Sequence, residues 1–110
     1  MKKHKAKKLT SSYEEWLIES LKDKREAATF LQVALDEYQK DGNVEAFLLA
    51  LRDVAQAQGG LAKLSKNTNL NRESLYKTLS SKGNPKFQTM GLLLKSLGFH
   101  LIIKPTKSIL

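Results

Sequence analysis

Residues 60–80, GLAKLSKNTNLNRESLYKTLS, restrict the possible fold more than any other segment of this chain. Residues suited to a helix interior recur there at the spacing of two short helices, at Leu61, Leu64, Thr68, Leu75 and Leu79. Asn69 lies between the two runs, and asparagine tolerates the positive φ of a sharp turn better than most residues. Asn71 can cap the second helix with its side-chain oxygen. The segment therefore predicts two helices joined by a tight turn.

This layout is that of a helix-turn-helix, in which the second helix lies in the major groove of DNA. Small Ser65 falls on the inner face of the first helix, where a bulky side chain would hold the two helices apart. The outward positions of the second helix are candidate base readers: Arg72, Glu73, Tyr76 and Lys77. An ordinary helical hairpin packed on a core would give the same pattern, so the motif alone leaves both interpretations open.

The distribution of charge favours a polyanionic partner. The chain carries 19 Lys and Arg against 11 Asp and Glu, a net charge of +8. Residues 1–8 hold five lysines and no acid, whereas residues 9–53 hold ten acids and five bases, a net charge of −5. Residues 54–110 hold nine bases and one acid, so the basic excess coincides with the predicted helix pair. Such cations release counterions from phosphates, although a merely solvated basic face is the alternative.

Composition bounds the class of protein. A chain of 110 residues with 41% hydrophobic residues suits one domain, or one domain with an extension, and a modest core. The absence of cysteine excludes disulfides and thiolate metal sites and suits a cytoplasmic location. No apolar run approaches the roughly 20 residues of a membrane span, and no apolar signal core follows MKKHKAKK. We therefore expect a cytoplasmic protein with no membrane partner.

The pattern along the chain predicts an all-α fold of five to six helices. Its divisions are a basic flexible arm at 1–9, an N-terminal helical extension at 10–42, and a helix-turn-helix domain at 43–110. The arm is more readily a solubilising tail than a DNA contact. Outside the helix pair, helices are expected at about 13–22, from the cap at Asp23 to about 40, at 44–58, and from Phe87 to Leu97. The apolar stripes, Phe87 included, are expected to form the core, with Trp16 as an anchor in the packing of the extension.

The C-terminal segment FHLIIKP predicts a short β-strand, because apolar residues alternate there and a proline ends the run. A lone strand cannot satisfy its backbone groups, so a second copy of the chain is the simplest partner. The expected homodimer interface is Phe99, Leu101, Ile102 and Ile103. The alternative is an apolar tail that lies against the core without pairing.

Catalysis is not expected. The two histidines, His4 and His100, have no cysteine or carboxylate at the spacing of a metal site or a catalytic triad. The chain also lacks a phosphate-cradling glycine loop. We therefore expect neither enzyme activity, nor a metal, nor a cofactor.

Several segments together resemble a known family. Between about Glu45 and Leu101, the runs AFLLALRDVAQAQGG, LNRESLYKTLS, SKGNP and LLLKSLGFHL closely resemble the helix-turn-helix antidote proteins of bacterial toxin–antitoxin (addiction) modules, which are of the Cro/repressor-like class. YEEWLIESLKDKREAATFLQVALDEY resembles the N-terminal part of the same family. One departure is Asn69, which stands where repressor-like motifs often have glycine.

The resemblance implies a dimer that binds operator DNA, represses its own operon and neutralises a small basic toxin of the RelE/ParE type. It implies base reading by the four outward residues of the second helix. It also implies phosphate contacts at Gly60, Lys63, Asn71, Ser74, Lys82 and Lys86.

The acidic stretch at 9–53 has no evident use in a protein meant only for DNA. It is either a solvated helical buttress or a docking surface for the toxin, with Trp16, Leu17 and Tyr38 as candidate anchors. The alternative function is a phage- or plasmid-type helix-turn-helix repressor without a toxin partner. A general nucleic-acid-binding protein is less favoured, because the chain has no aromatic cluster for base stacking.

Overall fold

The computed structural model describes residues 12–106. Residues 12–20 are helical, and five further helices follow: α2 (Lys24–Asp41), α3 (Glu45–Ala57), α4 (Gly60–Thr68), α5 (Arg72–Thr78) and α6 (Phe87–Ser96). The all-helical prediction is confirmed for this part of the chain, which contains no strand. The expected basic arm at 1–9 lies outside the described residues.

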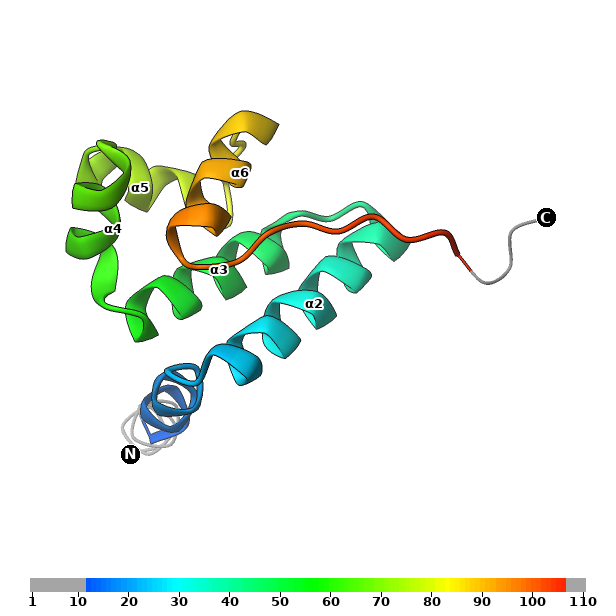
Figure 1. Cartoon of the computed structure of the whole chain (residues 1–110), viewed down its shortest axis with the longest axis horizontal. Coiled ribbons are helices and arrows are strands. Elements are labelled where there is room, and N and C mark those ends of the chain that lie inside the picture. Colours follow the sequence, from blue (N-terminus) through cyan, green and yellow to red (C-terminus); the bar gives the residue numbers. More distant parts are fainter. Residues whose placement is uncertain (1–11, 107–110) are drawn as a thin grey trace, which may run out of the picture.

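The helices form two groups that meet at α3. Helices α2 and α3 form an antiparallel hairpin, and α4, α5 and α6 gather beside α3 (Figure 1). The α4–α5 pair therefore rests on a hairpin platform. The segment after α6 returns along α2, since residues 100–104 line grooves together with residues 32–39 of that helix.

The helix ends follow local chemistry that the sequence already indicated. Asp23 Oδ1 accepts hydrogen bonds from the backbone N–H groups of Arg25 (2.8 Å) and Glu26 (3.2 Å), which caps α2. Gly98 has a φ of 91°, and its N–H and that of Phe99 bond to carbonyls of the last turn of α6. This is a Schellman ending, which only a residue tolerant of positive φ makes without strain.

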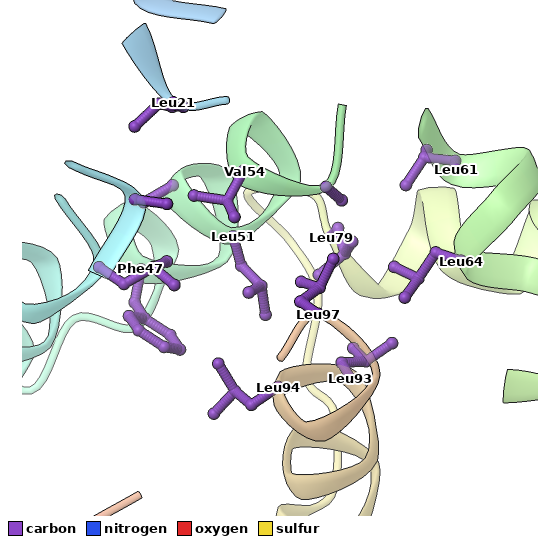
Figure 2. Packing of buried hydrophobic residues seen from close by; sticks show 14 of the residues in the cluster. Leu21, Phe47, Leu51, Val54, Leu61, Leu64, Leu79, Leu93, Leu94 and Leu97 are labelled. Atoms are coloured by element: carbon purple, nitrogen blue, oxygen red, sulfur yellow. The ribbon is translucent and has the colours of Figure 1, made fainter. Parts of the chain in front are cut away.

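One hydrophobic core joins every helical group. Its central members are Leu21, Phe47, Leu51, Val54, Leu61, Leu64, Leu79, Leu93, Leu94 and Leu97 (Figure 2). Leu21, Ala27 and Leu31 of the N-terminal extension belong to the same cluster as Leu75 of α5. Burying each large aliphatic side chain stabilises the fold by roughly 1.5–3 kcal/mol. The extension is therefore packed on the core that also supports the helix pair.

Two long side chains tie the extension to the rest of the fold. Gln58 Nε2 donates to the carbonyl oxygens of Leu21 (2.7 Å) and Lys22 (3.1 Å). Lys24 Nζ donates to the carbonyl of Leu97 and lies 5.3 Å from the centroid of the Phe99 ring. Both side chains satisfy carbonyls that helical segments leave open at their C-terminal ends, where a cation is also favoured by the helix dipole.

Two aromatic residues do not have the buried positions that their patterns predicted. Phe87 is 80% exposed, because it starts α6 and extends past the core, although it shares a stripe with Met90 and Leu94. Trp16 is 62% exposed, because Leu17 takes the packing position beside it. The Trp16 ring instead lies against Tyr13, with centroids 5.9 Å apart.

The C-terminal strand is not confirmed. Residues 99–106 lie outside helices and strands in the single chain. Phe99 packs on the core, but Ile102 is 68% exposed and Ile103 is 96% exposed. The described residues leave most of these two side chains exposed, and a strand in this segment would need a partner strand.

Candidate nucleic-acid interface

The turn between α4 and α5 has the conformation that the sequence predicted. Asn69 has a φ of 62°, in the left-handed region. Thr68 Oγ1 donates to the carbonyl of Leu64 (2.7 Å) and accepts from the N–H of Leu70 (3.3 Å). The Ser65 hydroxyl donates to the carbonyl of Leu70. These bonds close the turn and set the direction in which α5 leaves it.

Helix α5 has one buried face and one exposed face. Asn71 Oδ1 accepts from the N–H of Ser74 at 2.7 Å, which confirms the predicted cap. Leu75 is only 1% exposed and anchors the helix to the core. The four residues proposed to read bases, Arg72, Glu73, Tyr76 and Lys77, are all exposed. The buried leucine thus orients α5 so that these four side chains face outward.

Tyr76 has a neighbour that the sequence did not indicate. The guanidinium carbon of Arg52, on α3, lies 5.2 Å from the centroid of the Tyr76 ring. This cation–π contact restrains a side chain of α5 from the hairpin platform. The two residues are far apart in sequence. The sequence signal for this contact was a charged residue, Arg52, within the apolar run of α3.

The candidate phosphate contacts fall into two kinds. Lys63, Lys82 and Lys86 are exposed cations on α4 and on the loop that leads into α6. Gly60 begins α4 with a φ of 89°, where an N–H is open to an anion. Asn71 and Ser74 are already engaged with each other in the cap of α5, which leaves the Asn71 amide nitrogen and the Ser74 hydroxyl for any further contact.

Gly83 holds the lysine-bearing loop against the end of α5. A Cβ atom at this position would lie 2.1 Å from the carbonyl oxygen of Thr78, closer than any side chain allows. The Gly83 N–H also donates to the carbonyl of Ser80 at 3.0 Å. The loop that carries Lys82 and Lys86 is therefore packed on α5.

Within the described part of the chain, the cations on this side of the molecule form no salt bridge. Among residues 12–106 the one salt bridge joins Lys22 and Glu19, at 3.0 Å. The exposed Lys and Arg side chains of α4, α5 and the following loop are thus available to an external anion. No cluster of potential metal ligands occurs in the described part of the chain, and none of its helices is long and apolar enough to cross a bilayer.

The three candidate toxin anchors lie at two separate places in the fold. Leu17 lines a groove between residues 13–18 and α3, and Trp16 lies on the same helical segment. Tyr38 lies near the other end of α2, in a separate groove with Phe47 and Phe87. Helix α2 alone, at 18 residues, is about 27 Å long. One compact partner surface therefore does not follow from these three residues.

The first of these grooves contains a perturbed carboxyl group. Burial raises the pKa of Asp53, the nearby Arg52 guanidinium opposes that rise, and Glu14 adds to it. The groove has a volume of about 520 Å³ and is lined by Tyr13, Glu14, Leu17, Ile18, Leu49, Arg52, Asp53 and Gln56. Sequence reasoning missed the α3 residues of this site, because they come together with residues 13–18 only in the folded chain.

The described residues thus form an all-helical protein, and its candidate sites lie on exposed helices and in open grooves. The family follows from comparison with known proteins. The family model described as "Probable addiction module antidote protein" matches residues 13–105. The chain belongs to this family of antidote proteins, as its sequence motifs suggested, and the family is regulatory rather than catalytic.

A curated relative is an uncharacterized protein of Haemophilus influenzae (strain ATCC 51907 / DSM 11121 / KW20 / Rd). It is 32% identical over 77 residues, which cover 70% of this chain and 78% of the relative. No solved structure gives a significant match.

Proposed function

We propose that this protein is the antitoxin of a type II toxin–antitoxin module, which binds operator DNA as a homodimer in the cytoplasm and represses its own operon. Its second activity is to neutralise a small toxin of the RelE/ParE type. Membership of the antidote family supports a toxin partner, and so weighs against a phage- or plasmid-type repressor without one. The observation that carries the DNA-binding part is α5, whose buried Leu75 turns Arg72, Glu73, Tyr76 and Lys77 outward.

The chemistry of these four residues suits the major groove. Arg72 can donate two hydrogen bonds to the O6 and N7 atoms of guanine, and Glu73 can accept from the amino group of cytosine. Tyr76 is restrained by Arg52 and can bond a phosphate or pack on a thymine methyl. Lys63, Lys82 and Lys86 act as point charges toward the backbone, which requires no strict geometry.

In the proposed function the protein binds its operator as a homodimer. A two-fold pair of these chains would place two α5 helices about 34 Å apart, one turn of DNA. Leu101, Ile102 and Ile103, which are 46%, 68% and 96% exposed, supply an apolar edge for that pairing. The operator would then be a short inverted repeat.

A titration with two variants tests the base-reading role. Arg72→Ala should cost about 1–3 kcal/mol on the operator and little on random DNA, because the lost bonds are to bases. Lys82→Ala should weaken binding to all sequences alike and lower the salt dependence, because it loses a phosphate contact. Fluorescence anisotropy at several salt concentrations measures both. An equal loss on operator and random DNA for Arg72→Ala would show that α5 does not read the sequence.

A further inference from the structure

The groove between residues 13–18 and α3 combines exposed aromatic groups with negative charge. Tyr13 lines the groove and is 59% exposed, and the ring of Trp16, which is 62% exposed, lies beside the Tyr13 ring with centroids 5.9 Å apart. Leu49, on the α3 side, is 38% exposed. Exposed tryptophan and tyrosine clusters are typical of protein-binding surfaces, where such residues supply most of the affinity.

Acidic side chains outnumber basic ones in and beside the groove. Glu14 and Asp53 line it, and Glu15 and Glu19 lie on the adjoining face of the same helical segment, where Glu19 is paired with Lys22 at 3.0 Å. Arg52 is the cation of the groove, but its guanidinium lies over the Tyr76 ring. This surface therefore contrasts with the basic side that carries α4 and α5, and its negative charge would repel DNA.

The ionised form of Asp53 is disfavoured in the groove. Burial raises the pKa of its carboxyl group, the nearby Arg52 guanidinium opposes part of that rise, and Glu14 adds to it. A cation placed between these two carboxylates would offset both effects. A carboxyl group with a raised pKa beside an open groove is more common at binding sites than elsewhere on a protein.

Resting on the proposed function, we propose that this groove is where the toxin docks, and that the toxin inserts a basic, partly apolar segment into it. Lys or Arg side chains of that segment lie between Glu14 and Asp53, while its apolar residues cover Trp16, Tyr13 and Leu49. The opposite charges favour this occupant over a nucleic acid. They speed the encounter, and the aromatic contacts hold the complex.

The test uses the full-length protein and the purified product of the gene adjacent to its own, as the candidate toxin. Trp16→Ala should weaken the complex by about tenfold or more, mainly through faster dissociation. Glu14→Arg should weaken it by about tenfold as well, with slower association that becomes less distinct from wild type as salt rises. Biolayer interferometry measures both rates. Glu37→Arg is the matched control, since Glu37 is also an exposed acid but lies on α2 outside the groove, and it should change the affinity less than about twofold.

Operator binding by each variant shows that the fold is intact. If Trp16→Ala and Glu14→Arg both bind the toxin like wild type, the docking site is overturned while the antitoxin function stands. If they instead dissociate the homodimer and leave toxin affinity unchanged, the groove belongs to a second copy of the chain. If the wild-type protein does not bind the toxin at all, the proposed function fails together with the site.

Discussion

Gly83, in the loop before α6, and Gly91, within α6, have opposite surroundings. A Cβ atom at Gly83 would lie 2.1 Å from the Thr78 carbonyl oxygen, whereas a Cβ atom at Gly91 meets nothing within 4 Å. Gly83→Ala should therefore destabilise the protein by about 1–3 kcal/mol, because backbone must move. Gly91→Ala should stabilise it by up to about 1 kcal/mol, because α6 gains a better helix former. Urea denaturation measures both, and equal effects would contradict the packing described for the loop.

Asp53 should make stability depend on pH. Burial raises its pKa in the folded state by more than the Arg52 guanidinium lowers it, and Glu14 adds to the rise, so the folded protein binds this proton more tightly than the unfolded chain. Stability is then lost as pH rises through the folded pKa, and the penalty is fully present above it. Asp53→Asn should accordingly raise the melting temperature at neutral pH, and the difference from wild type should shrink in acid. A constant difference across pH would show that the carboxyl group is not under strain.

Most of the helices were predictable because their ends are set by contacts between residues close in sequence. The Asp23 cap, the turn at Asn69 and the ending at Gly98 all depend on residues within a few positions of each other. The Arg52–Tyr76 contact and the groove around Asp53 depend on the packing of distant helices, so no local pattern contained them. Phe87 was misjudged for a related reason, because a stripe gives the direction of a side chain but not where the core ends.

The C-terminal segment gives a prediction about dimerisation. Ile102→Pro removes a backbone donor and should dissociate the proposed dimer, because a paired strand cannot tolerate that loss. Ile102→Val keeps the N–H and the β-branched shape and should remain dimeric. Static light scattering gives the mass of each variant. A dimeric Ile102→Pro protein would exclude pairing through residues 99–104.

One hydrophobic core supports two surfaces of opposite charge. The acidic stretch at 9–53 and the basic stretch at 54–110 are joined by a cluster that includes Leu21, Leu31 and Phe47. Removing residues 1–40 would therefore uncover part of that core, so point variants separate the two proposed activities better than truncation. The charge division was visible in the sequence, but the shared core required the fold.

Operator recognition is tested by a titration of the wild-type protein against DNA from immediately upstream of its own gene. A shuffled duplex of the same length and composition serves as the control. At physiological salt the upstream DNA should bind at least about a thousandfold more tightly than the shuffled duplex, as expected of a specific regulator. Equal affinity for the two duplexes would contradict operator recognition by α5.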